Sequence, residues 1–364
     1  MHAPSKIAAP NGIVATAAQV RSRGENSYDF VRFCAASFVL FSHHFDLAGR
    51  PEPQVPGLGE DFGELGVEIF FCLSGFLICQ SLQRNPDWAH FIAARVLRIF
   101  PNLAFVLVVT SVVTLVWYGN YANLWAHAGY VIGNLLLFVN GVTLTLPGIF
   151  TDAVRAAVNE PLWTLPYELW CYALLFLMFA VSSRRSGICV IVGVLAIGIA
   201  WTATSAAGET NVDSLNGPDF FRLGAYFLSG STLALFWPRI EKNALAIGLA
   251  GLAGAFAVRN LAPVDTILVS FTLACAVIGL GNSGAMGWFS KGGDASYGMY
   301  VFAWPVQQFA HLLIGSFWLS LVAAFLITTA IGYGTWHGFE KRAMAHRGQM
   351  AEWARGRRFR RAET

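Results

Sequence analysis

Several ionisable side chains lie inside long apolar runs, where a charge is costly. Arg32 and His43 lie in the first such run, Glu68 in the second, Glu168 in the fourth and Arg222 in the sixth. On membrane-insertion scales a charged residue at a helix centre costs roughly 2.5 to 3.5 kcal/mol, so such residues tend to face the inside of a helix bundle and to mark function. They predict a polar site within the bundle that combines cations, carboxylates and a titratable imidazole.

The spacing of Arg32 and His43 places them on one helix face. They are eleven residues apart, and a turn of 100° per residue brings them back to within about 20° of each other, about 16.5 Å apart along the axis. The two side chains therefore share a face without touching. Two alternatives remain open: Arg32 could be a snorkelling anchor beside Asp29, and His43 could be an interfacial residue.

The elements that must position these side chains follow from composition. The chain has 364 residues, of which 55% are hydrophobic and only 12% charged, with a mean hydropathy of +0.54. These values exclude a soluble multi-domain enzyme. The apolar runs have the length of a helix that crosses a bilayer, about 20 residues, and they lack the alternation of barrel strands. We expect an all-α, polytopic integral membrane bundle.

About ten membrane-spanning helices are predicted. Residues 123–141 are also apolar but contain His127 and two asparagines, so we expect a re-entrant or interfacial segment there, with an eleventh span as the alternative. The six cysteines show no metal-ligand spacing, and no metal site is predicted. The predicted spans are 29–48, 64–83, 100–119, 162–182, 187–206, 219–237, 244–258, 262–282, 294–313 and 316–338.

The basic residues predict the orientation, because lysine and arginine collect in cytoplasmic loops. With both termini cytoplasmic, the outer loops hold only Arg50, Arg155 and Arg259 of the chain's 24 lysines and arginines. We therefore expect a flexible cytoplasmic segment at 1–27, a transmembrane domain at 28–341 and a basic cytoplasmic tail at 342–364. Cations beside a membrane bind anionic lipid, so this tail indicates a lipid contact rather than a nucleic-acid site.

Six sequence blocks carry a resemblance to a known family. The chain resembles membrane-bound acyltransferase family 3, which includes exopolysaccharide, O-antigen and Nod-factor O-acetyltransferases. Many members have a histidine where this chain has Ala303, so Gln307 and Gln308 are expected to make polar contacts rather than to supply a base. The blocks are Arg32 and His43 with ten residues between them, "GVEIFFCLSGFLI" from Gly66, "RVLRIFP" from Arg95, "PLWTLPYELWCY" from Pro161, "DASYGMYVFAWPVQQ" and "TWHGFEK".

The resemblance implies transfer of an acyl group, commonly acetyl, from cytoplasmic acyl-CoA to a hydroxyl of a carbohydrate or glycolipid. Acyl-CoA would be a co-substrate, with no bound cofactor. Arg95 and Arg98, with Arg32 behind them, would bind its phosphates, and His43 would be the general base. Glu168 would orient the imidazole or contact the acceptor. Further residues that could contact the acceptor or support the site are Glu68, Trp163, Tyr167, Gln307 and Gln308, whereas Ser74 is expected to permit close packing beside Gly75.

Other readings remain at this point. A membrane transporter is the alternative function, although inverted repeats are not visible in the sequence, and a non-catalytic scaffold would not need the arginine, histidine and glutamate set. The compact architecture favours a bacterial inner membrane. The expected partners are acyl-CoA, the acceptor and membrane lipids, without nucleic acid. The acceptor, the acyl group and the choice between direct transfer and an acyl-imidazole stay open.

Overall fold

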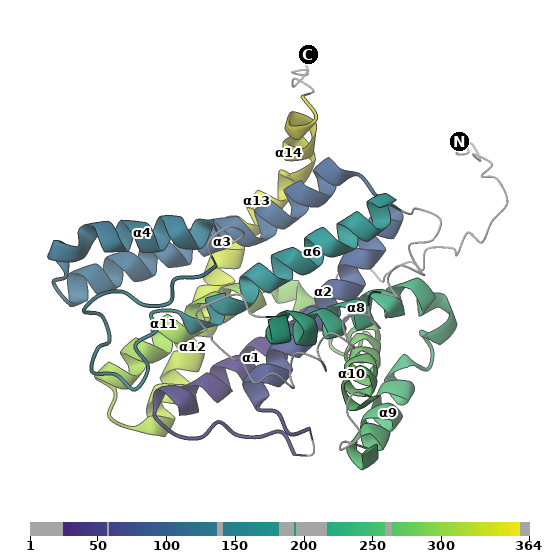
Figure 1. The fold of residues 1–364 in the computed structure, drawn as a ribbon, viewed down its shortest axis with the longest axis horizontal. Coiled ribbons are helices and arrows are strands. Elements are labelled where there is room, and N and C mark those ends of the chain that lie inside the picture. The colour runs from purple at the N-terminus through teal and green to yellow at the C-terminus, as the bar shows by residue number, and fades with distance from the viewer. Residues whose placement is uncertain are drawn as a thin grey trace.

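The computed structural model describes residues 25–56, 58–136, 141–181, 217–258 and 264–356, together with residue 193. Within these residues the fold is all-α, as predicted, and the only strand-like pairing is an isolated bridge between Gln54 and Asp61 (Figure 1). The helices are α1 (Tyr28–Leu47), α2 (Phe62–Arg84), α3 (Trp88–Trp117), α4 (Leu124–Leu135), α6 (Thr164–Val181), α8 (Gly217–Ile240), α9 (Ala244–Val258), α10 (Val264–Asn282), α11 (Ser296–Leu313), α12 (Phe317–Thr335), α13 (Lys341–Ala345) and α14 (Arg347–Ala354).

Each predicted span within the described residues overlaps one long helix, whereas the span 187–206 lies outside them apart from residue 193. Length and composition alone qualify four helical stretches to cross a membrane, namely Phe62–Arg84, Trp88–Trp117, Glu160–Ala180 and Phe317–Ala345. The polytopic class is therefore supported, while the number of ten spans and the orientation stay predictions.

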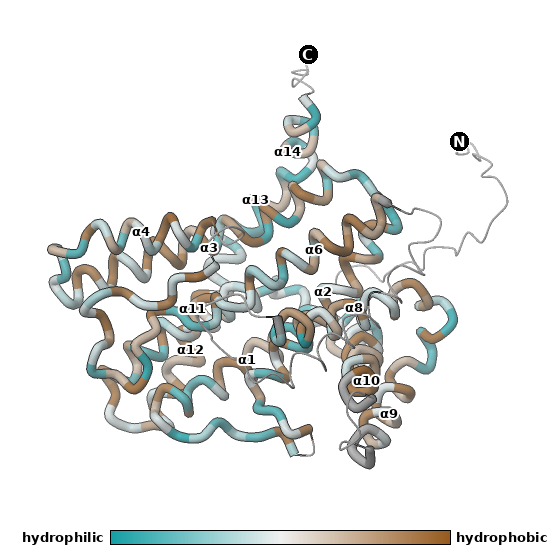
Figure 2. Tube along the Cα trace, in the orientation of Figure 1, coloured by the Kyte–Doolittle hydropathy of each residue, from teal (hydrophilic) through white to brown (hydrophobic). Residues whose placement is uncertain are grey.

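The outer surface of the bundle is apolar where a bilayer would contact it. Val112 and Val116 on α3 and Leu319 and Leu326 on α12 are each more than half exposed. Figure 2 shows hydrophobic residues along these helices and more hydrophilic ones in the loop after α1 and on α14. Exposed apolar stripes on neighbouring long helices are unfavourable in water and suit contact with hydrocarbon chains.

α2 is the central helix, and it packs most closely on α8. Its start is set by Asp61, whose side chain accepts a hydrogen bond from the Glu64 backbone nitrogen (2.8 Å) while Glu64 caps in return. A Cβ atom added at Gly75 would clash with the Phe227 carbonyl oxygen, and one added at Gly230 would clash with that of Cys72. The two helices therefore touch backbone to backbone, which only glycine allows here.

α3 begins twelve residues before the predicted span. Asp87 caps its first turn by accepting from the Ala89 backbone nitrogen (3.2 Å). The added turns are covered by α14, where Ala351 packs against Ala89 and Ala93 and Arg355 forms an ion pair with Asp87. Part of the segment expected to be a basic tail is therefore helical and folds back onto the bundle, which the positive charge pattern alone does not reveal.

Within the apolar segment 123–141, of which residues 137–140 are not described, the short helix α4 packs beside α3 (Figure 1). Its 12 residues extend over about 18 Å, well short of the roughly 30 Å hydrocarbon core. His127 is buried and its Nδ1 atom lies 3.1 Å from the Ser111 hydroxyl on α3. The length of α4 argues against an eleventh span.

Candidate active site

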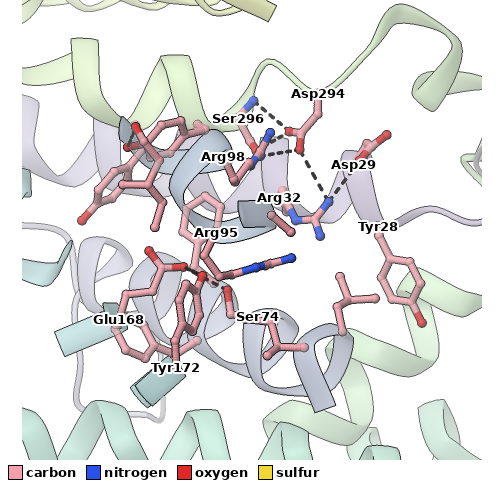
Figure 3. A pocket seen from close by; sticks show the side chains of 18 of the residues that line it. Tyr28, Asp29, Arg32, Ser74, Arg95, Arg98, Glu168, Tyr172, Asp294 and Ser296 are labelled. Carbon is pink, nitrogen blue, oxygen red and sulfur yellow. Dashed lines mark hydrogen bonds and ion pairs between the residues drawn. The ribbon is translucent and has the colours of Figure 1, made fainter. Parts of the chain in front are cut away.

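A cavity of about 400 Å³ lies among α1, α2, α3, α6 and α11, with residues from the C-terminal helices at its edge (Figure 3). We call it the arginine pocket. It brings together the predicted donor-binding residues Arg32 from α1 and Arg95 and Arg98 from α3. The predicted carboxylate Glu168, from α6, lies in the same cavity. Its polar lining consists chiefly of Asp29, Arg32, Ser74, Arg95, Arg98, Thr164, Glu168, Tyr172, Asp294, Ser296, Tyr300 and Arg347.

Asp294 holds two of the arginines in place. Arg98 donates to its Oδ2 atom at 2.6 Å, and the Nη1 atom of Arg32 lies 3.6 Å from the same oxygen (Figure 3). Asp294 itself is buried and accepts from the Ser296 hydroxyl. Arg32 also pairs with Asp29 (3.1 Å), the i,i+3 contact that the sequence suggested. Asp294 therefore joins α1 and α3 to the start of α11 across the pocket.

Arg95 has a different environment from Arg98, one turn away on α3. It has no hydrogen-bond or ion-pair partner in the described part of the chain, and its Nε atom is buried without one. Its guanidinium carbon lies 5.7 Å from the centre of the Tyr172 ring, a cation–π contact that orients the group without neutralising it. Arg95 is thus a preplaced cation that is open to an anionic ligand.

Glu168 lies in the arginine pocket. Its Oε1 atom accepts a hydrogen bond from Ser74 (3.2 Å) and another from the Tyr172 hydroxyl, while Oε2 has no partner among the described residues (Figure 3). Ser74, expected only to permit packing, therefore also points into the pocket and fixes this carboxylate.

His43 lies in a second polar cluster, which we call the histidine site and define as Ser42, His43, Glu52 and Trp304. The Nδ1 atom of His43 lies 3.9 Å from Glu52 Oε1, and the imidazole meets the Trp304 ring edge to face with 5.2 Å between centroids. The Ser42 hydroxyl donates to Glu52 Oε2. The His43 side chain is only 17% exposed, so the ring is directed into the protein and not towards the lipid.

The electrostatics of the histidine site centre on Glu52, in the loop between α1 and α2. Burial by itself would raise the pKa of Glu52, and the contacts with His43 and Ser42 outweigh that effect, so its pKa lies below the usual value. Glu52 is therefore an anion at neutral pH.

Helix α11 carries residues of both regions. The Tyr300 hydroxyl lies 2.7 Å from the Thr164 hydroxyl and donates to the Pro161 carbonyl oxygen at 3.0 Å, and both Tyr300 and Thr164 line the arginine pocket. Trp304, which contacts His43, follows Tyr300 by one turn of α11. His43 is not among the residues that line the pocket.

The expected pairing of Glu168 with His43 is not what the structure shows. In the described residues no hydrogen bond or ion pair joins them, and Glu52 provides the carboxylate beside the imidazole instead. Glu52 was missed because it lies in a loop, where neither periodicity nor burial cost marks a residue.

The remaining predicted residues have mainly structural contacts. Glu68 is fully buried and pairs with Arg222 at 3.1 Å between α2 and α8. Gln307 donates to the Leu40 carbonyl oxygen, and Gln308 donates to that of Arg155, so both make the polar contacts that were expected. Trp163 and Tyr167 pack edge to face against each other (5.7 Å between centroids), and neither lines the arginine pocket.

Comparison with known proteins gives consistent matches. The profile of an acyltransferase domain, that of acyltransferase family 3, matches residues 25–337. An "O-acetyl transferase" of Shigella phage Sf6 is 29% identical over 329 residues, which cover 87% of this chain and 95% of that protein. "Nodulation protein 10" of Rhizobium leguminosarum bv. viciae is 28% identical over 355 residues, which cover 88% and 93%. No solved structure matches the chain.

Proposed function

This chain belongs to acyltransferase family 3, and from that premise we propose that it is a membrane-embedded O-acyltransferase. The donor is an acyl-CoA, with acetyl as the first candidate, and the acceptor is a hydroxyl of a carbohydrate or glycolipid. The acyltransferase assignment rests on the family and on a relative named as an O-acetyl transferase. The donor, the acceptor class and the residue roles below are our proposal.

The observation that carries the proposal is the arrangement of the arginine pocket in line with His43. Arg32 and His43 are about 16.5 Å apart on one face of α1. The pantetheine arm of CoA, about thirteen bonds from pyrophosphate to sulfur, extends over roughly 15 Å at backbone-like bond lengths and angles. A donor with its phosphates at the arginines and its arm along α1 would thus present its thioester close to the depth of His43.

Each group of the pocket then has a role in holding the donor. Arg95 contacts phosphate, since a guanidinium forks onto two phosphate oxygens and this one has no competing carboxylate. Arg32 and Arg98 line the pocket beside Arg95, and Asp294 fixes their positions. Glu168, held by Ser74 and Tyr172, accepts an amide N–H of the pantetheine arm through its free oxygen.

The reaction proceeds at His43. As the acceptor oxygen attacks the thioester carbonyl, His43 takes the hydroxyl proton, the carbon–sulfur bond breaks and CoA leaves as a thiolate that is then protonated. In this proposal the acyl group moves from the arginine pocket, whose lining includes Tyr300 and Thr164, to the imidazole. The positive-inside pattern puts the arginine pocket on the cytoplasmic side, where acyl-CoA is available, and His43 towards the opposite side.

Purified protein in phospholipid vesicles tests the proposal. Acetyl-CoA labelled in the acetyl group is placed on one side of the membrane, and thiol release and label transfer to methyl glycosides or to extracted glycolipid are followed. We expect thiol release that depends on the acceptor and on His43. Uptake of a glycoside without thioester cleavage would instead establish a transporter.

A further inference from the structure

The imidazole of His43 has one buried nitrogen without a hydrogen bond. Its Nδ1 atom is enclosed and unpartnered at hydrogen-bonding distance, and the nearest carboxylate oxygen is Glu52 Oε1, 3.9 Å away. Nε2 is not enclosed in this way. The two ring nitrogens therefore differ: one faces a carboxylate inside the protein, and the other is available to a substrate.

Glu52 is itself held in place. Its Oε2 atom accepts a hydrogen bond from Ser42, the residue next to His43, and the Ser42 side chain is fully buried. Ser42 also lies 3.3 Å from Asp61, the residue that caps α2. Through these contacts the loop that carries Glu52 is fastened to the end of α1 and to the start of α2.

Other charged groups surround the site without touching the imidazole within ion-pair distance. Glu160, in the turn before α6, is close enough to His43 to interact through charge. Arg155 is held by Asp46 on α1, with its Nη2 atom 2.7 Å from Asp46 Oδ1. Trp304 covers one side of the ring. Within the described residues, Glu52 is the carboxylate placed at Nδ1.

We propose that Glu52 is the positioning residue of His43, an inference that rests on the proposed function. By accepting a hydrogen bond from Nδ1–H, it fixes the imidazole tautomer in which Nε2 carries the lone pair and faces the acceptor hydroxyl.

The chemistry follows the logic of a carboxylate that orients a catalytic histidine. When Nε2 takes the acceptor proton, the ring becomes a cation, and the Glu52 anion stabilises that cation without receiving the proton. The present separation is about 1 Å longer than a charge-assisted hydrogen bond, and catalytic hydrogen bonds of this kind often shorten only when substrate is bound.

The test compares Glu52→Gln and Glu52→Asp with the matched control Glu60→Gln. Glu60 lies in the same loop but faces Glu68 rather than His43. For Glu52→Gln we expect kcat to fall about 100-fold or more, with an unchanged KM for acetyl-CoA. The acid limb of the pH–rate profile should move to lower pH, because a ring without its anion gives up its proton more readily. For Glu52→Asp we expect an acid limb at the wild-type pH and a kcat between those of wild type and Glu52→Gln. For Glu60→Gln we expect the wild-type kcat and the wild-type pH–rate profile.

Two results would overturn the inference. One is a Glu52→Gln variant with wild-type kcat and an unmoved acid limb. The other is a loss of kcat without any change of the pH profile, which would show a merely structural role. If Glu52→Gln does not fold, Glu52→Asp decides, since a shifted acid limb in that variant would contradict the role. An inactive His43→Ala beside a fully active Glu52→Gln would reject this inference alone, whereas no thioester cleavage by wild type would reject the proposed function.

Discussion

The arginine pocket and the histidine site lie at opposite ends of one face of α1, and they are built in different ways. The arginine pocket takes its cations from helices, Arg32 from α1 and Arg95 and Arg98 from α3. The histidine site takes its imidazole from a helix but its carboxylate from a loop. Under the proposed roles, donor binding would be fixed by the bundle itself, whereas catalysis would also depend on the order of a surface segment.

The substitution with the largest expected effect, at His43, tests whether the two regions have different functions. We expect His43→Ala to lower kcat by about 10²- to 10⁴-fold, the range for loss of a general base, while acetyl-CoA still binds. Isothermal titration with acetyl-CoA and a turnover assay measure the two quantities on one sample. His90→Ala, on α3 and outside both regions, should retain activity. Loss of donor binding in His43→Ala would mean that the regions are a single site.

Arg98→Ala should act on stability, because it leaves the buried Glu340 without the cation beside it and removes the shorter of the two arginine contacts of Asp294. Removing one partner of a buried ion pair costs about 3 to 5 kcal/mol. A lower midpoint of thermal unfolding in detergent would show this cost, and Arg98→Lys should recover part of it. An Arg98→Ala protein as stable as wild type would show that Asp294 does not fasten the pocket.

Arg95→Ala should give the opposite result from Arg98→Ala, although the two arginines lie one turn apart. Arg95 has no ion-pair partner to abandon in the described chain, so unfolding should change little. Loss of a charge-assisted hydrogen bond costs about 1.5 to 3 kcal/mol, which corresponds to a rise in the KM for acetyl-CoA of roughly 10- to 100-fold. An unchanged KM would remove Arg95 from the donor site.

The smallest effect is expected at Arg347, an exposed residue at the edge of the pocket. Exposed charge pairs contribute at most about 1 kcal/mol, so Arg347→Ala should raise the KM for acetyl-CoA about two- to fivefold. The rise should disappear with acetyl-dephospho-CoA if Arg347 contacts the 3′-phosphate. Arg342→Ala on α13 is the matched control, and an equal effect in both variants would indicate only a general loss of positive charge.

Much of the fold could be predicted because the long helices are apolar runs. The convergence of Arg32, Arg95 and Arg98 could also be predicted, since all three belong to spans or to their ends. The role of Asp294 could not be predicted, because a carboxylate beside the start of a helix is common and the two arginines that it contacts lie far away in the sequence. The return of α14 onto α3 depends on contacts of Ala89 and Ala93, which small apolar residues do not signal.

The site was predicted less well where loops contribute. Glu168 had a strong signal, a carboxylate inside an apolar run; the structure places it in the arginine pocket beside Ser74 and Tyr172, and its role stays a prediction. Glu52 had no signal, because an acidic residue in an outer loop is the ordinary case. A charged residue inside an apolar run is energetically unfavourable and can therefore be recognised from the sequence. A residue whose importance depends only on a neighbour in space can be recognised only from the three-dimensional structure.

The glycine contacts between α2 and α8 limit which amino-acid substitutions the protein can accept. Gly75 follows Ser74 directly, so one side of α2 faces the arginine pocket while the adjacent side rests on another backbone. A larger residue at position 75 would push the helix sideways and carry Ser74 away from Glu168. Engineering of donor preference should therefore start from α6 and α11, whose side chains can be exchanged without moving the helix on which the others are aligned.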